Sequence, residues 1–203
     1  MSTSPQSKSN LRIAQLSLLI ALVVVLQLLS YTIKIGTFNL SLVLIPIVVG
    51  AALLGERAGA LLGCVFGIVT LLASAFGLDL GGNVLWLANP LMTTLICLVK
   101  GTAAGLVAGL IIRAFANTKH PRLGIWLGAL AAPVVNTGLF VGGMLLVFRD
   151  ILTEWAAGDG TAHYIVFGLL GLNFLIEVAI NALLSPTVIR IIGAVRKNRG
   201  LRV

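Results

Sequence analysis

Four polar residues lie well inside long apolar stretches of the sequence, where their side chains could bind a ligand. They are Lys100, Asn136, Asn173 and Glu177. Counting along helices from the same side of the apolar stretches places all four at a similar depth, roughly 14–20 Å from the edge. An ionised side chain in such surroundings is retained only where it is paired, hydrated or used for function. Lys100 is therefore the first candidate functional residue.

Two interpretations of this polar level remain open. Asn173, Glu177, Asn181 and Ser185 follow one another at four-residue spacing and predict one polar stripe on a helix that faces protein. In the structural interpretation, Lys100 and Glu177 form a buried ion pair. In the functional interpretation, a pocket opens from outside, Lys100 binds an anionic group, and the asparagines bind amide or hydroxyl groups. The two are compatible, because Glu177 would partly neutralise Lys100 in an empty pocket.

Further candidate binding residues lie near the expected entrance of this pocket. Asn83, Trp86 and Asn89 belong to the long connecting segment Gly77–Asn89, and Asn39 lies near the preceding connection on the same side. Long connections of this kind often carry binding residues. Trp86 is equally typical of an aromatic anchor at a membrane interface.

The same inventory argues against an enzyme. Glu177 is the only acidic residue at depth, and His120 and His163 lie in or beside loops, so we expect no catalytic residues and no metal ligands. Cys64 and Cys97 fall in separate apolar stretches and predict neither a disulfide nor a metal site. The sequence has no GxxxxGK(S/T) segment, so we do not expect this chain to hydrolyse ATP.

Long apolar helices must position these side chains. The chain has 203 residues, of which 59% are hydrophobic and 10% are charged, a composition typical of an integral membrane protein. About 20 helical residues cross a hydrocarbon layer of about 30 Å, and the apolar runs lack the alternation of barrel strands. We expect an all-α bundle of six transmembrane helices in a single membrane domain, residues 1–203. The expected helices cover about residues 13–33, 36–55, 58–77, 90–113, 123–148 and 163–192, after a polar cytoplasmic tail at residues 1–12.

The basic residues predict the orientation of these helices. With both termini in the cytoplasm, eleven of the fourteen Lys and Arg residues are cytoplasmic, and only Lys34 and Arg149 lie outside. The remaining one, Lys100, lies within an apolar stretch. This distribution follows the positive-inside rule. The net charge of +8 is thus explained by orientation and by contact with anionic lipids of the bilayer, and it does not indicate nucleic acid.

Small residues predict where helices pack closely. Glycine recurs at every fourth position in two expected helices, at Gly59, Gly63 and Gly67 in the third and at Gly101, Gly105 and Gly109 in the fourth. Such ridges are typical of close contacts within a bundle. Small residues also line one face of the first expected helix, at Ala14, Ser17 and Ala21. An external helix could dock on that face, although small pairs are common in membrane helices.

Several segments together resemble the substrate-binding subunit, or S component, of energy-coupling factor (ECF) vitamin transporters. The basic N-terminus and the small-residue face are followed by LIPIVVGAALLGERAGALLGCVFGIVTLL, ANPLMTTLICLVKGTAAGLVAGLIIRAF and APVVNTGLFVGGMLLVF. The resemblance implies six helices in a prokaryotic plasma membrane and high-affinity capture of a vitamin from outside. It also implies a transmembrane coupling subunit and two cytosolic ATPase subunits, which use ATP and Mg, with no cofactor in this chain. By this resemblance Ala14, Ser17 and Ala21 dock the coupling subunit, although Ser17 stands where alanine is usual.

Within that family, the succession Asn89–Pro90, Lys100 and Asn136–Thr137 looks most like the pantothenate-type members, where the basic residue is more often arginine. Pantothenate offers one carboxylate for Lys100 and amide and hydroxyl groups for Asn136 and Asn173. Riboflavin or folate is the alternative vitamin, but their ring systems favour more aromatic residues than the 6% present. Outside the family, a stand-alone proton-coupled carrier or channel remains an alternative, because Lys100 and Glu177 could form a relay.

Overall fold

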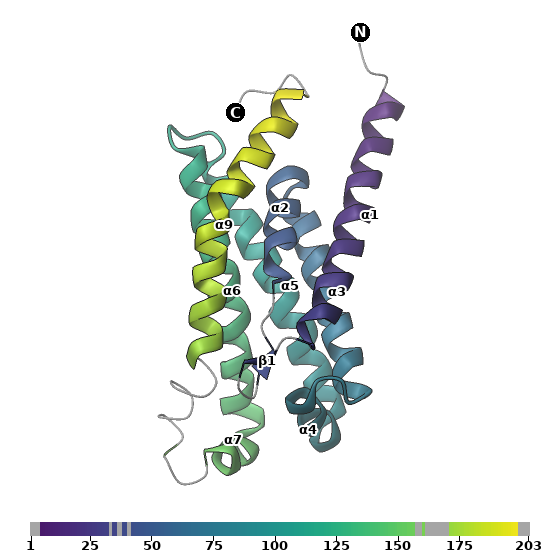
Figure 1. The fold of residues 1–203 in the computed structure, drawn as a ribbon, viewed down its shortest axis with the longest axis vertical. Coiled ribbons are helices and arrows are strands. Elements are labelled where there is room, and N and C mark those ends of the chain that lie inside the picture. Colours follow the sequence, from purple (N-terminus) through teal and green to yellow (C-terminus); the bar gives the residue numbers. More distant parts are fainter. Residues whose placement is uncertain are drawn as a thin grey trace.

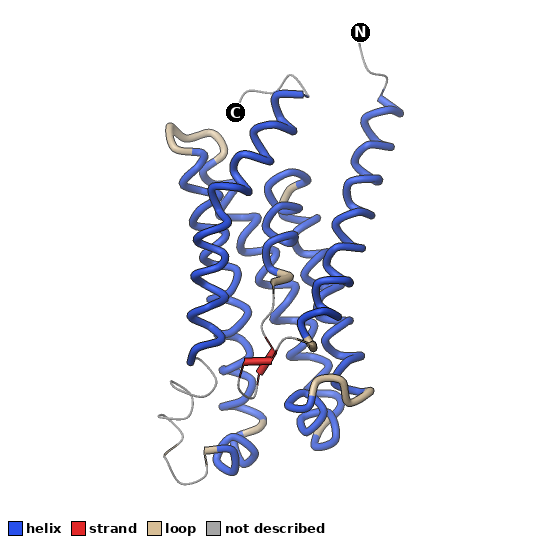
Figure 2. Tube along the Cα trace, in the orientation of Figure 1, coloured by secondary structure: helices blue, strands red, loops and turns tan. Residues whose placement is uncertain are grey.

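The computed structural model describes residues 5–32, 34–35, 38–39, 42–156, 160 and 171–198. Within them the chain forms an elongated bundle of helices (Figure 1). The helices are α1 (Pro5–Ser30), α2 (Leu44–Leu54), α3 (Glu56–Ala75), α4 (Leu80–Ala88), α5 (Pro90–Phe115), α6 (Pro121–Val147), α7 (Arg149–Trp155) and α9 (Gly171–Asn198). Two short strands, β1 (Lys34–Ile35) and β2 (Phe38–Asn39), pair antiparallel between α1 and α2 (Figure 2).

The all-helical class is confirmed, apart from this small hairpin. Four helices of the described chain are long and apolar enough to cross a membrane, namely Ser9–Ser30, Glu56–Ala75, Pro90–Phe115 and Pro121–Val147. α9 has 28 residues and is not among these four. The start of α1 and the end of α9 lie at the same end of the bundle, opposite α4 and α7 (Figure 1). The count of six spans and the cytoplasmic side of the termini stay predictions.

The second expected helix, residues 36–55, differs most from the structure. Phe38 and Asn39, within the expected helix, form strand β2, and α2 starts only at Leu44 and has 11 residues, too few to cross a membrane. The sequence between Lys34 and Asn39 contains Gly36 and Thr37, which are poor helix formers. Pro46 then falls in the first turn of α2, where proline is tolerated. Gly55, with φ of 99°, joins α2 to α3 in a conformation that favours glycine.

Two segments expected to be irregular contain short helices. α4 lies within Gly77–Asn89, and α7 directly follows α6 after Phe148. Leu85 of α4 and Leu152 of α7 are buried in one apolar cluster with Met144 and Phe148. Apolar contacts with the end of α6 thus stabilise both helices.

Glycines bring α3 and α5 into direct backbone contact. A Cβ atom added to Gly59 would lie 2.5 Å from the carbonyl oxygen of Gly105, and one added to Gly67 would lie 2.5 Å from that of Cys97. Between these two contacts, Gly63 and Gly101 face each other at even closer range. The predicted close packing is confirmed for these ridges, and it makes α3 and α5 a tightly fitted pair.

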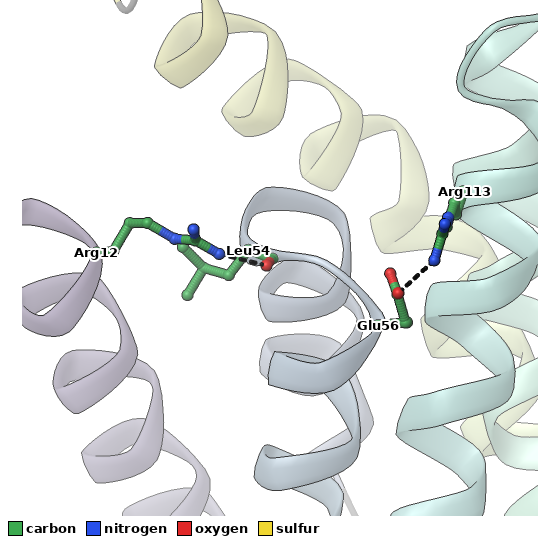
Figure 3. A network of polar contacts seen from close by, with 4 residues as sticks. All are labelled: Arg12, Leu54, Glu56 and Arg113. Atoms are coloured by element: carbon green, nitrogen blue, oxygen red, sulfur yellow. Dashed lines mark hydrogen bonds and ion pairs between the residues drawn. The ribbon is translucent and has the colours of Figure 1, made fainter. Parts of the chain in front are cut away.

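Two arginines tie helices together at the end of the bundle away from α4 and α7 (Figure 3). Arg12 of α1 donates to the carbonyl oxygen of Leu54, 3.1 Å away, at the C-terminal end of α2. A cation is favourable at that end of a helix dipole. Arg113, near the end of α5, pairs with Glu56 in the first turn of α3 at 2.6 Å. Both arginines thus form contacts between helices at this end of the bundle, away from the polar level.

Candidate functional site

A cavity of about 140 Å³ lies at the polar level, in the half of the bundle that carries α4 and α7. Side chains from α1, α3, α5, α6 and α9 line it, together with residues of α4 and α7. Three of the predicted site residues, Lys100, Asn136 and Glu177, line this one cavity. The structure therefore brings together the polar residues of three helices that the sequence placed at one depth.

Lys100 of α5 places its ammonium group between two aromatic rings. Nζ lies 4.9 Å from the ring centroid of Phe140 on α6 and 5.8 Å from that of Phe66 on α3. Both distances are typical of cation–π contacts. Glu177 lines the same cavity, but across the described residues the ion pair present is that of Arg113 with Glu56, and Lys100 forms none. The structure does not support the interpretation of a Lys100–Glu177 ion pair.

Asn136 of α6 presents a buried hydrogen-bond acceptor without a partner. The residue is 7% exposed, and its Oδ1 accepts no hydrogen bond within the described part of the chain. A buried polar atom left without a partner costs about 1–3 kcal/mol. Since Asn136 lines the cavity, a ligand with an N–H or O–H group would supply the missing donor. Pro133 is buried one turn earlier and leaves a backbone carbonyl of α6 without its helical donor.

The predicted polar stripe of α9 faces the interior of the bundle. Glu177, Asn181 and Ser185 are 8%, 3% and 0% exposed. Asn181 donates to the carbonyl oxygen of Glu177 at 2.8 Å, and Ser185 donates to that of Asn181 at 2.6 Å. Of these three, only Glu177 lines the cavity. The side chain of Asn173 lies outside the described residues, so its predicted contact stays a prediction.

The opposite wall of the cavity carries a hydrogen-bonded group that was not among the principal predicted residues. Gln27 of α1 donates from Nε2 to the hydroxyl oxygen of Tyr31, 2.7 Å away, and to that of Thr70, 3.3 Å away. All three line the cavity. Gln27 and Tyr31 are one turn apart in the sequence, as are Thr70 and Ser74. The four-residue spacing that revealed the stripe of α9 could have revealed this wall as well.

The predicted entrance residues have other positions. Asn89 caps α5, accepting from the backbone N–H of Met92 at 3.1 Å, and Asn83 donates to the carbonyl oxygen of Ser74 at 2.8 Å. Neither these two nor Trp86 line the cavity, whereas Asp79 and Trp155 do. The side chain of Asn39 lies outside the described residues. Asn83 and Asn89 thus stabilise the local backbone.

The small residues of α1 lie on its outer surface. Ala14, Ser17 and Ala21 are all exposed, and so are Leu18 and Leu22 beside them. Leu19 and Val23, on the other side of α1, are buried in the core. The face predicted for docking is therefore accessible to a partner or to lipid.

The described residues contain no group of three or more His, Cys, Asp or Glu side chains arranged to hold a metal ion. Cys97 is buried and lines the cavity, three residues before Lys100.

Taken together, the described residues that line the cavity can bind a small molecule through the ammonium group of Lys100, the free acceptor of Asn136 and several hydroxyl and amide groups.

Comparison with known proteins places this cavity in context. A family model described as "ECF transporter, substrate-specific component" matches residues 11–189. The chain is also similar to a protein from Lactococcus lactis subsp. cremoris (strain MG1363) named pantothenic acid transporter PanT. The two are 26% identical over 197 residues, which cover 92% of this chain and 95% of the relative. The range matched by the family model contains every residue that lines the cavity.

Proposed function

This chain belongs to the family of ECF transporter substrate-specific components, and we propose that it captures a small anionic vitamin, with pantothenate as the best candidate, from outside the cell. The vitamin enters the cavity between α1, α3, α5, α6 and α9. It is then delivered inward with a transmembrane coupling subunit and two cytosolic ATPase subunits in the plasma membrane.

The observation that supports this proposal most strongly is that Lys100 and the free Oδ1 of Asn136 line the same cavity. A cation and a buried acceptor suit a ligand with a carboxylate and a nearby donor. Asn136 Oδ1 has no hydrogen-bonding partner in the described structure, so a ligand that donates to it would remove an existing energetic cost.

Pantothenate fits this pair chemically. Its carboxylate suits Lys100, and its amide N–H or one of its hydroxyl groups suits Asn136. Further hydroxyl contacts are available on the wall formed by Gln27, Tyr31 and Thr70. The pantothenate transporter from Lactococcus, similar along nearly its full length, points the same way.

The exposed face at Ala14, Ser17 and Ala21 is the proposed docking surface for the coupling subunit. Small side chains let a second helix approach closely. The inner face of α1 is already buried by its own bundle, so the outer face is the one left for a partner.

The proposal can be tested on the purified chain without partners. The protein is denatured, and any small molecule released is identified by mass spectrometry. We expect pantothenate or a close relative from cells that contain it. Binding of pantothenate, riboflavin and folate to the emptied protein is then measured in parallel. Tight binding of riboflavin or folate instead would identify another vitamin, and an empty protein that conducts ions in liposomes would favour a channel.

A further inference from the structure

The ammonium group of Lys100 has two kinds of counter-group within the cavity. One is the pair of aromatic rings, Phe140 at 4.9 Å and Phe66 at 5.8 Å. The other is Glu177, an acidic residue that lines the same cavity. In the structure, Lys100 lies on the rings and forms no ion pair with Glu177 among the described residues.

These two arrangements differ in what they leave for a ligand. A carboxylate neutralises an ammonium group, and an incoming anion must then break that ion pair. An aromatic face stabilises the cation through its quadrupole without supplying a negative charge. A lysine held on aromatic rings thus keeps its attraction for an anion.

The positions of the two phenylalanines fit this role. Phe66 is 2% exposed and packs in the core between α1, α2 and α3, so its ring is fixed in place. Phe140 packs beside the apolar cluster of α4, α6 and α7. The rings come from α3 and α6, and Lys100 comes from α5 between them. The glycine contacts of α5 with α3 hold Lys100 in register with Phe66.

We propose that Phe66 and Phe140 are positioning residues that hold the Lys100 ammonium away from Glu177, so that it stays available to the anionic group of the ligand. The proposal rests on the proposed function in that the ligand is an anion. It adds a specificity device, because the rings make the site prefer a carboxylate over its neutral analogue.

Binding to the purified full-length chain tests this with two ligands, pantothenate and its neutral amide, in which a carboxamide replaces the carboxylate. Phe140→Leu lets Lys100 turn to Glu177, and we expect about tenfold weaker binding of pantothenate with little change for the amide. Phe140→Tyr keeps an aromatic face and retains the preference. The double variant Phe140→Leu/Glu177→Gln lacks the competing carboxylate. We expect it to bind pantothenate almost as tightly as the single variant Glu177→Gln does.

Phe174→Leu is the matched control, because Phe174 also lines the cavity but makes no ring contact with Lys100 in the described structure. Any loss of packing there affects both ligands alike, so the ratio of the two affinities is unchanged. An unchanged ratio in Phe140→Leu, or an equal loss with and without Glu177→Gln, would overturn the proposal.

A ligand-free measurement separates this proposal from the identity of the vitamin. In thermal unfolding, Glu177→Gln should lower the midpoint more in the Phe140→Leu background than in the wild type, because only there does Lys100 depend on Glu177. Equal shifts in both backgrounds contradict the positioning role. If wild-type protein binds no pantothenate, the proposed substrate is wrong, and the unfolding cycle still decides the role of the rings.

Discussion

Lys100 is the residue on which ligand capture depends in this account. Its ammonium group reaches a cavity from the middle of α5, where an unused charge is unfavourable. Lys100 is a charged donor, whereas Asn136 contributes a neutral acceptor, Oδ1, which lacks a donor in the described structure. Replacement of the two side chains should therefore have different effects. Removal of the Lys100 ammonium weakens the attraction for the ligand, whereas removal of the Asn136 amide also eliminates a buried polar atom that has no partner in the described structure.

Replacement of Lys100 tests the first of these roles. Lys100→Met keeps the length of the side chain and removes its charge, and we expect pantothenate to bind about tenfold to hundredfold more weakly, as for loss of a charged hydrogen bond. Equilibrium binding to purified protein measures the change. Lys100→Arg should retain binding. Lys119→Met, in an exposed loop at the far end of the bundle, is the control and should bind as the wild type does.

Replacement of Asn136 should separate stability from affinity. Asn136→Leu has a similar volume and removes the unsatisfied Oδ1, so we expect the ligand-free protein to gain about 1 kcal/mol in its free energy of unfolding. The same change removes the acceptor for the ligand and weakens binding about tenfold. Thermal unfolding and equilibrium binding give the two values. A less stable variant with unchanged affinity would show that Oδ1 has a structural partner.

Part of the site could be predicted at this scale from the sequence. Counting residues from the ends of the apolar stretches placed Lys100, Asn136 and Glu177 at one depth, because rise per residue is constant in a helix. Counting gives no rotation of a helix about its axis. The contacts of Lys100 with Phe66 and Phe140, and the hydrogen bond between Gln27 and Thr70, depend on that rotation and therefore required the structure.

At the scale of helices, the backbone contact between α3 and α5 fixes the position of the site. Lys100 directly precedes Gly101, which faces Gly63 across the two helices. The contact is possible because neither residue has a side chain. A change in this interface should therefore be felt at the cavity, although no interface glycine touches the ligand in our account.

The interface gives a prediction with an internal control. Gly63→Val places side-chain atoms against the backbone of Gly101 and should destabilise the protein by about 1–3 kcal/mol, with weaker ligand binding as α5 shifts. Gly142→Ala in α6 meets nothing within 4 Å and should leave stability unchanged or raise it. Thermal unfolding of both variants checks this pair. Equal effects would contradict a special role for the α3–α5 contact.

The helices also show which parts of a fold are local. α1, α3, α5 and α6 are long and apolar, and these local properties made them predictable. The start of α2 and the helices α4 and α7 are different. They depend on a hairpin and on contacts of Leu85 and Leu152 with residues of other segments, which no short stretch of sequence contains.

At the scale of the whole molecule, binding and transport are separate properties. The cavity lies within this chain, whereas the described residues have no site for metal-assisted chemistry and the sequence has no nucleotide-binding motif. We propose that energy enters through other subunits, and the exposed face of α1 is where we expect them to act.

Helix α1 offers a direct test of this separation. Ser17→Trp fills the small-residue face and should abolish uptake of labelled pantothenate by cells that also express the coupling and ATPase subunits. Binding to the purified chain should be unchanged, because Ser17 is exposed and far along α1 from Gln27. Leu29→Trp, at an exposed position of the same helix about 90° around the axis from that face, is the control and should transport normally. Normal uptake by Ser17→Trp would place the docking surface elsewhere.

An experimental structure of the chain with bound pantothenate would show which side chains hold the vitamin. We predict the ligand in the cavity between α1, α3, α5, α6 and α9, with its carboxylate within hydrogen-bonding distance of Lys100 Nζ and an N–H or O–H group donating to Asn136 Oδ1. A ligand bound elsewhere, or one whose carboxylate points away from Lys100, would contradict the account.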